Sequence, residues 1–379
     1  MKVLHVIPSL SAIHGGPSAV HPLIERALTH RGIEVETITT DDEGVGRKNG
    51  KGDGTARHEN GVIRRYFPKQ TEFYKVSLPL AHWLKREVKR FDLIHIHALF
   101  SFASLTAARA ARKEGIPYII RPLGVLNRYG VTQRRALLKK LSLRWLEGPA
   151  LRHAAAVHFT MDEEREEAEC LAIGFKSIVI PLGLEQTTLP AQKSSTSASV
   201  LVLSRIDPVK NLEALLEAWS VAVVGRRDWR LVIAGAGDPD YVSSLKRLCG
   251  TLGIQDSVDW VGQVTGEGKA RLLEGAGLFT QPSFSENFGI AAAEALQAGK
   301  ACLFTPGVAV GAWAARMGAA AISGPVSGEL AAALGKLMDD GAVRLELGRK
   351  ASAFAASELS ASIMGERLHQ LYQQLAAHS

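Results

Sequence analysis

Short runs of apolar, often β-branched residues alternate with stretches of helix-forming composition along the whole chain. The apolar runs of the first half cover residues 2–8, 34–40, 92–99, 117–121 and 155–160. The stretches of helical composition between them cover residues 18–31, 79–90, 102–114, 134–147 and 162–172. Alternation of this kind is typical of βαβ units, so we predict a parallel sheet with helices on both faces.

The same alternation begins again after a stretch without apolar periodicity. Residues 184–199 are rich in Ser and Thr, and we place the domain boundary there. The apolar runs of the second half cover residues 199–204, 230–234, 258–261, 278–281 and 302–305. The sequence therefore predicts an α/β protein with two Rossmann-like, doubly wound domains, residues 1–184 and 197–358. An amphipathic helix in residues 359–379 can pack back on the first domain.

The composition fits two soluble domains in a reducing compartment. A chain of 379 residues with 46% hydrophobic and 22% charged residues can bury a core in each domain. The three cysteines lie far apart and form no C-x-x-C pair, which argues against disulfides or a zinc site and fits the cytoplasm. His5 and Pro8 interrupt the apolar N-terminus, which indicates a buried strand rather than a signal peptide or a membrane span.

Positive charge is concentrated in the first half of the chain. Residues 1–190 hold 28 Lys and Arg against 20 Asp and Glu, whereas residues 191–379 hold 17 against 18. A basic surface attracts anionic lipid headgroups and nucleic acid alike. The chain has no RNA-recognition motif, no zinc-finger spacing and no aromatic-rich basic stripe. We therefore expect no nucleic-acid partner.

The segment from Gln133 to Arg152 combines this basic charge with leucines at helical spacing. Leu137, Leu138, Leu141 and Trp145 stand beside Lys139, Lys140 and Arg144. Helices of this composition lie at membrane surfaces, so contact with an anionic membrane is one interpretation. The alternative, which we favour slightly, is an ordinary amphipathic helix that packs its leucines on the sheet and exposes its lysines. Both hold if lysine side chains reach lipid headgroups while the leucines stay buried.

The strongest chemical signal is the sequence SENFGIAAAE, residues 285–294, which follows an apolar strand and opens an alanine-rich helix. Glu286 precedes that helix and Glu294 lies inside it, so both can face the region beyond the strand. Backbone amides between the two carboxylates suit an anionic ligand. These amides belong to Asn287, Phe288, Gly289 and Ile290. Carboxylates accept hydrogen bonds from sugar hydroxyls, so the pattern favours a nucleotide sugar. Taken singly, Glu286 would be a helix-dipole partner and Glu294 a solvated position.

A second signal is the sequence SRIDPVKNL, residues 204–212. Arg205 follows the first strand of the second half, and Lys210 lies near the start of the next helix. Two fixed cations at one strand end can stabilise a departing diphosphate without a metal ion. The alternative is a surface ion pair between Arg205 and Asp207 with a solvated Lys210.

Three other patterns are weaker. Gly15 and Gly16 lie between the first strand and the first helix, where the backbone can approach a phosphate or an acceptor closely, although a glycine pair is more often a turn. His95 and His97 share one strand face, but no third metal ligand is near them in sequence, so we reject a metal site. Asp238-Pro239-Asp240 resembles a metal-binding D-x-D motif, but its place before a helix favours capping.

In these motifs the chain resembles glycosyltransferase family 4, the group 1 transferases of GT-B architecture, and the resemblance spans nearly the whole chain. It implies two Rossmann-like domains that face each other across a cleft. The second binds a nucleotide-sugar donor, and the first binds the acceptor. The resemblance also implies transfer with retention of anomeric configuration, and we expect no metal and no other cofactor.

The resemblance assigns roles to individual residues. Arg205 and Lys210 match the family's cationic pair, Glu286 lies near the donor sugar, and Glu294 lies near the ribose. His97 faces the donor sugar and the acceptor. The remaining donor-side candidates are Gly15, Gly16, Gly235, Gly237, Val261 and residues 287–290. The remaining acceptor-side candidates are Arg121, Gly124 and Asn127.

From the sequence we thus expect a retaining glycosyltransferase. It would move a sugar to a glycan, a polyprenyl-linked acceptor or another acceptor, in polysaccharide or glycoconjugate biosynthesis. We expect it in the cytoplasm, with contact to the inner face of the membrane as one possibility. An epimerase of the same architecture would instead turn over the donor alone. A non-catalytic protein that binds sugar nucleotides or nucleic acid is the other alternative.

Overall fold

The computed structural model describes the whole chain except residues 12, 14–15, 127–135, 186–196 and 378–379. The chain forms two compact units. One consists of Met1–Gly183 together with Ala361–Ser379, and the other of Leu184–Ser360. The last helix therefore belongs to the first unit, although the whole second unit precedes it in the chain.

An eight-stranded sheet forms the centre of the first unit. Its strand order is β3-β4-β2-β1-β5-β6-β7-β8, and all neighbours pair in parallel except β3 and β4. The strands are β1 (Lys2–Val6), β2 (Glu34–Thr40), β3 (Arg57–Glu59), β4 (Val62–Phe67), β5 (Leu93–His97), β6 (Tyr118–Arg121), β7 (Ala156–Phe159) and β8 (Ser177–Val179). Because parallel strands run in one direction, the loops that follow β1, β5, β6 and β7 meet at one edge of the sheet.

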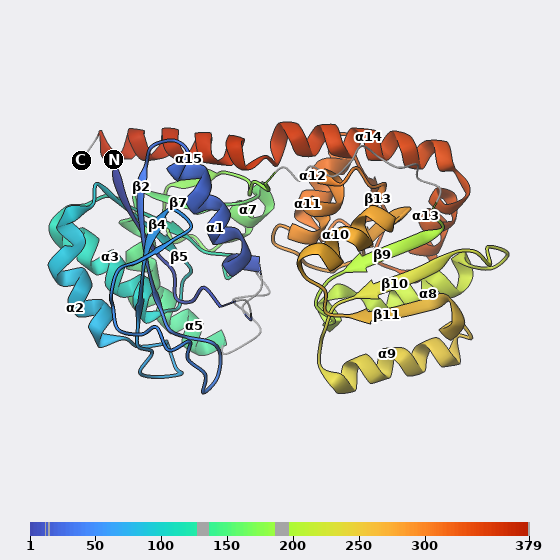
Figure 1. The fold of residues 1–379 in the computed structure, drawn as a ribbon, viewed down its shortest axis with the longest axis horizontal. Helices are drawn as coiled ribbons and strands as arrows, with labels where there is room; N and C mark the ends of the chain where they lie inside the picture. The colour runs from blue at the N-terminus through green and yellow to red at the C-terminus, as the bar shows by residue number, and fades with distance from the viewer. Residues whose placement is uncertain (12, 14–15, 127–135, 186–196, 378–379) are drawn as a thin grey trace. The chain divides into compact units, whose positions relative to one another are not determined.

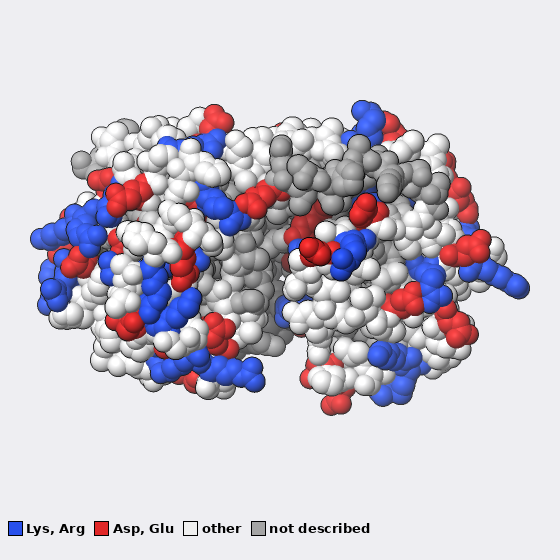
Figure 2. All heavy atoms as spheres, viewed as in Figure 1, with Lys and Arg blue, Asp and Glu red and all other residues white. Residues whose placement is uncertain are grey.

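Helices cover both faces of this sheet (Figure 1). α2 and α3 lie on one side, and α1 and α15 pack together on the other. The helices of the first unit are α1 (Gly16–Thr29), α2 (Leu78–Glu87), η2 (Val88–Arg90), α3 (Phe102–Glu114), α5 (Ala136–Ser142), the π-helix η3 (Leu143–Glu147), α6 (Gly148–Arg152), α7 (Asp162–Glu169) and α15 (Ala361–Ala376). Lys and Arg side chains gather over α2 (Figure 2).

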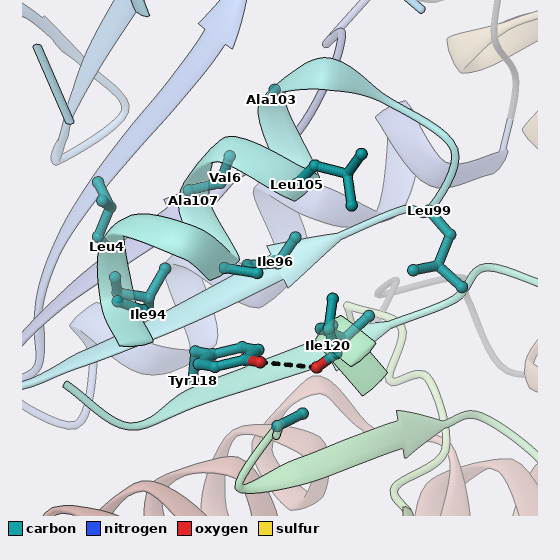
Figure 3. Packing of buried hydrophobic residues seen from close by; sticks show 14 of the residues in the cluster. Leu4, Val6, Ile94, Ile96, Leu99, Ala103, Leu105, Ala107, Tyr118 and Ile120 are labelled. Carbon is teal, nitrogen blue, oxygen red and sulfur yellow. Dashed lines mark hydrogen bonds between the residues drawn. The ribbon is translucent and has the colours of Figure 1, made fainter. Parts of the chain in front are cut away.

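Side-chain alternation along the strands divides the core of the first unit into two faces. Leu4, Ile94 and Ile96 point to the side of α3, where they pack against residues such as Ala107 (Figure 3). The next residues along these strands, including His5 and His95, point to the opposite face because side chains alternate with period two. One face of the sheet is therefore apolar, and the other carries buried polar groups beneath α1 and α15.

A six-stranded, wholly parallel sheet forms the centre of the second unit, in the order β11-β10-β9-β12-β13-β14. Its strands are β9 (Ser199–Leu203), β10 (Arg230–Ala234), β11 (Val258–Gly262), β12 (Leu278–Gln281), β13 (Cys302–Phe304) and β14 (Ala321–Ile322). Its helices are η4 (Pro208–Lys210), α8 (Leu212–Ala222), α9 (Pro239–Thr251), η5 (Gln255–Ser257), α10 (Gly266–Gly275), α11 (Ile290–Gln297), α12 (Ala309–Arg316), α13 (Ser327–Asp339) and α14 (Gly341–Glu358). This is the second α/β sheet that the sequence predicts.

The differences from the predicted elements lie in short or charged segments. β3 and β4 were not predicted, because Arg64 and Arg65 interrupt the apolar pattern of β4. The helix predicted to begin at Leu359 begins two residues later, since α14 ends at Glu358 and α15 covers Ala361–Ala376. The aspartate pair at 238 and 240 caps α9, as predicted. Asp238 Oδ1 accepts hydrogen bonds from the N–H groups of Asp240 (3.0 Å) and Tyr241 (3.2 Å).

Two glycines allow the loop after β10 to lie against the loop after β9. The N–H of Ile206 donates to the carbonyl of Ala236 at 2.8 Å. A Cβ atom at Gly235 would lie 1.8 Å from the carbonyl oxygen of Ser204, and one at Gly237 would lie 2.0 Å from that of Ile206. These glycines therefore fix the backbone on both sides of Arg205.

We expect Gly237→Ala to lower the free energy of unfolding of the second unit by about 1–3 kcal/mol, the usual cost of forcing extra volume into a packed site. Gly250→Ala is the matched control, because Gly250 lies inside α9, where an added Cβ atom would meet none of the described residues within 4 Å. Alanine there should raise stability by about 0.5–1 kcal/mol. Urea denaturation followed by circular dichroism measures both, and equal stability of the two variants would contradict the packing argument.

Candidate functional site

The loop after β12 lies between two neighbouring loops at the carboxyl edge of the second sheet. The N–H of Phe284 donates to the carbonyl of Val209, which follows β9, at 2.9 Å. The N–H of Glu286 donates to the carbonyl of Gly307, which follows β13, at 2.7 Å. Glu286 therefore lies beyond the carboxyl ends of three adjacent parallel strands, which is where α/β sheets bind ligands.

Lys210 reaches Glu286 from the loop after β9. The side chain of Asp207 caps η4 by accepting a hydrogen bond from the N–H of Val209 at 3.1 Å, and this turn ends at Lys210. The Lys210 ammonium contacts the Glu286 carboxylate, and the lysine side chain is only 9% exposed. Gln281 Nε2 donates to the same carboxylate oxygen at 2.9 Å. The alternative of a solvated Lys210 is therefore wrong.

Arg205 lies five residues before Lys210 and is exposed. Within the part of the chain that the structure describes, its guanidinium has no ion pair, and the surface pair with Asp207 that was the alternative interpretation is not formed. The loop thus presents one buried cation, which a carboxylate neutralises, and one cation that is open to solvent. An anionic ligand can approach Arg205 without first displacing a protein group.

Glu294 has a cationic partner of its own. It lies in α11, and its Oε1 is 2.5 Å from the Nζ of Lys269 in α10. Gly289 adopts the left-handed φ of 96° directly before α11 begins at Ile290. Phe288 is buried, and its carbonyl accepts from the N–H of Val310 at 3.0 Å. The helix start is thereby held rigidly beside the Glu286 loop.

The other donor-side candidates occupy the same sheet edge or fall outside the described residues. Gly235 and Gly237 follow β10. Their close packing against the loop after β9 accounts for glycine at both positions without a ligand. Val261, near the end of β11, is 44% exposed. Asn287 is half-buried and Gly16 begins α1, while Gly15 lies outside the described residues.

Five buried histidines and a tyrosine form a connected network in the first unit. They come from β1, β5, β7, α1 and α15, and lie on the sheet face opposite α3. The members of the network are His5, His21, His95, His97, His158 and Tyr372. Only His95 and His97 were singled out from the sequence. His5, His21 and His158 are isolated in the sequence, and the fold alone brings them together.

The network fixes which nitrogen of each neutral imidazole carries its proton. A carbonyl can only accept, so His158 Nε2 donates to Ile180 O at 2.9 Å and His158 Nδ1 accepts from His95 Nε2 at 3.4 Å. His95 Nδ1 then accepts from the Tyr372 hydroxyl at 2.6 Å.

The alternation of hydrogen-bond donor and acceptor from one side chain to the next continues to the carboxyl end of β5. The oxygen of Tyr372 accepts from His5 Nε2 at 3.3 Å, and His5 Nδ1 accepts from His97 Nε2 at 3.2 Å. His97 Nδ1 is left as a buried acceptor without a partner among the described residues. A ligand hydroxyl is the kind of group that would satisfy it.

Burial keeps four of the imidazoles, those of His5, His95, His97 and His158, neutral. Loss of solvation, reinforced by neighbouring His21, lowers the pKa of His5 to about 3. Burial and the charge of Arg121 lower the pKa of His158 to about 3. The pKa of His97 is held well below 6.5 by burial and then by His95. At neutral pH, His97 therefore acts as a neutral hydrogen-bonding group rather than a cation.

Three of the histidines also have the geometry of a metal-binding group. His5, His21 and His97 each offer a nitrogen, and the three nitrogens lie within 4.8 Å of one another. The reason given from the sequence for rejecting a metal site, the lack of a third ligand, was therefore wrong. Burial, and to a smaller extent the charge of Arg121, lowers the pKa of His5 and His97, and the same positive charge opposes the binding of a divalent cation here.

Arg121 lies beside His97 in the sheet, and only 4% of it is exposed. Its Nε has no partner among the residues that the structure describes. Burial lowers the pKa of Arg121 to about 10, and the charge of Glu164 opposes this effect. Gly124 donates its N–H to Glu164 Oε1 at 2.8 Å. The fourth acceptor-side candidate, Asn127, lies outside the described residues.

The segment for which two interpretations were open exposes its leucines. Leu137, Leu138 and Leu141 are 79%, 54% and 56% exposed, and Trp145 is 68% exposed. The interpretation that we favoured, in which these side chains pack on the sheet, is therefore wrong. Residues 133–135 lie outside the described residues. In the part of the chain that the structure describes, none of the helices combines the length and apolar character that crossing a membrane would need.

Two family models match the chain. The model "Glycosyl transferase 4-like domain" matches residues 15–183, and the model "Glycosyl transferases group 1" matches residues 187–354. The boundary between them falls within a few residues of the boundary between the two structural units.

Similar curated proteins act on nucleotide sugars and lipid-linked acceptors, according to their names. The chain is 26% identical over 303 residues to a GDP-mannose:cellobiosyl-diphosphopolyprenol alpha-mannosyltransferase of Xanthomonas oryzae pv. oryzae, covering 79% of this chain and 77% of that protein. It is 25% identical over 302 residues to the enzyme of the same name from Komagataeibacter xylinus, covering 79% and 74%.

Solved structures share the fold over the full length. Sucrose-phosphate synthase from Thermosynechococcus elongatus matches with a TM-score of 0.76 at 20% identity and covers 100% of both chains. Anabaena Alr3699/HepE in complex with UDP and glucose matches with a TM-score of 0.75 at 17% identity, covering 99% of this chain and 100% of that one. The predicted GT-B fold is confirmed.

We expect the histidine network to make the first unit sensitive to acid. A buried histidine with a lowered pKa takes up a proton on unfolding, so the stability it contributes above pH 6.5 is lost as the pH falls toward its folded pKa of about 3. Near pH 5, each such histidine adds a slope of about 1.4 kcal/mol per pH unit. His158→Gln should reduce the measured slope by about that amount, as determined from denaturation curves between pH 4 and 6.5. The control is His58→Gln, at an exposed position in β3, and an unchanged slope in the His158 variant would contradict the argument.

Proposed function

The chain belongs to the group 1 glycosyltransferases, and from this membership we propose that it transfers a sugar, with retention of configuration, from a nucleotide-diphosphate donor to a lipid-linked acceptor. The donor would bind the second unit and the acceptor the first. The single observation that carries the proposal is the contact between Lys210 and Glu286, with Arg205 open to solvent on the same loop.

The proposed chemistry needs a stabilised leaving group. As the bond between the sugar and the diphosphate breaks, negative charge grows on the phosphate oxygens. Arg205 and Lys210 would neutralise this charge, assisted by the N–H groups at the start of α11. A donor diphosphate would compete with Glu286 for the Lys210 ammonium and leave the carboxylate to accept a hydrogen bond from a sugar hydroxyl. We propose that no metal ion and no cofactor take part.

Retention follows if the acceptor hydroxyl attacks on the face from which the diphosphate departs. The departing phosphate oxygen then takes the hydroxyl proton, so the new glycosidic bond forms without a nucleophile from the protein. Glu294 would accept from the ribose, and the neutral Nδ1 of His97 would accept from a hydroxyl of the donor sugar or the acceptor. These roles rest on the family resemblance together with the positions described above.

Relatives suggest the first substrates to test. Two proteins that align with 79% of this chain are named as enzymes that use GDP-mannose and a diphosphopolyprenol acceptor. We propose a donor of this class and an acceptor that carries a diphosphate and a polyprenyl chain, in the biosynthesis of a polysaccharide or another glycoconjugate. Such an acceptor resides in a membrane, so the enzyme would work at the inner face of the cytoplasmic membrane.

Exposed cations on α5 and on the π-helix η3 that follows it support contact with that membrane. Leu137, Lys140 and Arg144 follow one another at intervals of three and four residues, which places them near one side of the helix. All three are exposed. An exposed leucine beside two cations is the composition of a helix that lies in the headgroup region of an anionic bilayer.

We expect Lys210→Ala and Arg205→Ala each to lower kcat/KM for transfer from GDP-mannose by at least about 100-fold, because each removes a charge that stabilises the leaving group. Arg227→Ala, an exposed position in the second unit, serves as the control and should leave transfer unchanged. Circular dichroism checks that all three variants fold. Full activity of the Lys210 and Arg205 variants would refute these roles.

The same assay tests the rest of the proposal. Transfer should persist in EDTA, and NMR of the product should show the anomeric configuration of the donor. Conversion of the donor in the absence of any acceptor would instead identify an epimerase. Loss of transfer in EDTA that Mg²⁺ restores would contradict the metal-independent mechanism.

We expect the protein to bind vesicles that contain phosphatidylserine and to bind pure phosphatidylcholine vesicles weakly. Replacing both Lys140 and Arg144 by Glu should weaken vesicle binding by more than about 10-fold, since each basic residue near such a surface contributes about 1 kcal/mol. Co-sedimentation at several salt concentrations measures this. Arg227→Glu provides the matched charge reversal on the other unit, and an equal loss with that variant would argue against a specific surface.

A further inference from the structure

An apolar pocket of about 760 Å³ lies beside α5 in the first unit. One wall consists of Phe73, Tyr74 and Phe100, and the other of Leu138, Leu141 and Trp145. Its volume falls in the range of about 300–1,000 Å³ that is typical of pockets for small organic ligands. The polar side chains that line it are few and include Glu72, Lys139 and Ser142.

The pocket is open rather than part of the core. Phe73 is 60% exposed, and Leu138, Leu141 and Trp145 are each more than half exposed. Folding does not bury these side chains, so their exposure costs free energy that an apolar ligand would recover.

The aromatic wall is held in place before any ligand arrives. Tyr74 and Phe100 both adopt left-handed backbone conformations, with φ of 58° and 54°. The carboxylate of Glu147, at the end of the π-helix, accepts from the Tyr74 hydroxyl at 2.7 Å and from the Phe100 N–H at 3.0 Å. Left-handed non-glycine residues and π-helices are both found preferentially at functional sites. Here they occur together around one pocket.

The carboxyl group that holds this wall belongs to Glu147, which does not itself line the pocket. Burial raises the pKa of Glu147 to about 7, and the hydrogen bonds from Tyr74 and Phe100 oppose that rise. The carboxylate that does line the pocket, that of Glu72, is paired with the ammonium of Lys69 at 2.9 Å. Lys139 lines the pocket and Lys140 follows it in α5, so an anionic headgroup at the pocket could meet a cation there.

The pocket lies next to the edge of the sheet at which His97 ends β5. Phe100 follows His97 by three residues, so their Cα atoms are at most about 11 Å apart. An amphiphile whose chain occupies the pocket can thus place its polar end near the free Nδ1 of His97.

We infer that this pocket binds the hydrocarbon chain of the acceptor, an isoprenoid attached to a diphosphate. This inference rests on the proposed function for the identity of the acceptor. The chain would lie between the aromatic wall and α5, and the diphosphate would lie toward Lys139 and the carboxyl end of β5. The acceptor is then recognised by its lipid as well as by its sugar.

The test uses geranylgeranyl diphosphate as the probe, in buffer without vesicles or detergent and below its aggregation concentration. Trp145 lines the pocket, so a change in tryptophan fluorescence should report binding, and calorimetry measures the dissociation constant independently. Leu141→Gln should weaken binding at least about 10-fold. Leu137→Gln is the matched control, because Leu137 is on the same helix, is more exposed and does not line the pocket. Both positions are solvent-exposed, so neither variant threatens the fold.

Three results would overturn the inference. Equal weakening by the two leucine variants would mean that the probe adheres to the surface of α5 in general. Equal affinity for inorganic diphosphate would mean that only the headgroup is bound. Loss of phosphatidylserine vesicle binding in Leu141→Gln with retained binding of geranylgeranyl diphosphate would assign the pocket residues to the membrane.

Failure of the proposed function remains distinguishable from failure of this inference. Lys210→Ala should bind geranylgeranyl diphosphate as the unaltered protein does while losing transfer, because Lys210 belongs to the second unit. If no sugar is transferred from any donor and the probe still binds with the expected difference between the leucine variants, the pocket assignment stands and the proposed reaction is wrong.

Discussion

Parallel strand pairing is the constraint on which both units depend. It forces every loop that follows a strand to emerge at one edge of its sheet, so residues distant in sequence converge there. In the second unit this convergence brings Lys210 after β9 to Glu286 after β12. In the first unit it places His97 at the end of β5 beside Arg121 at the end of β6. The chemistry of the chain is thus a property of sheet edges rather than of any single motif.

The carboxyl edges of the two sheets differ in the charge of their buried side chains. The second unit keeps a buried ammonium neutralised by a carboxylate. The first unit keeps His5, His95, His97 and His158 neutral, because burial lowers their pKa and nearby positive groups such as Arg121 add to this effect. One edge suits a diphosphate that develops charge, and the other suits hydroxyl groups, which need oriented neutral acceptors.

Much of this arrangement could be predicted from the sequence. The apolar runs predicted the parallel strands, and the spacing of Glu286 and Glu294 with Arg205 and Lys210 singled out the loops at one edge. The contacts of Lys210 and Gln281 with Glu286 were beyond prediction, since side-chain pairing depends on which loops become neighbours. His5, His21 and His158 carry no local pattern at all. The exposure of Leu141 and Trp145 was predicted wrongly because helical spacing shows that residues share a side, but not whether that side meets the protein.

The return of α15 to the first unit imposes an order on biosynthesis. Tyr372 lies in the centre of the histidine network, and α15 packs against α1. Both contacts must wait until the ribosome has made the whole of the intervening unit. The part encoded first is therefore completed last, and the later part can reach its native state before it. In a fragment that ends at Gly183, the face of α1 that α15 covers would be exposed. The first unit therefore depends on the end of the chain, even though each unit has its own core.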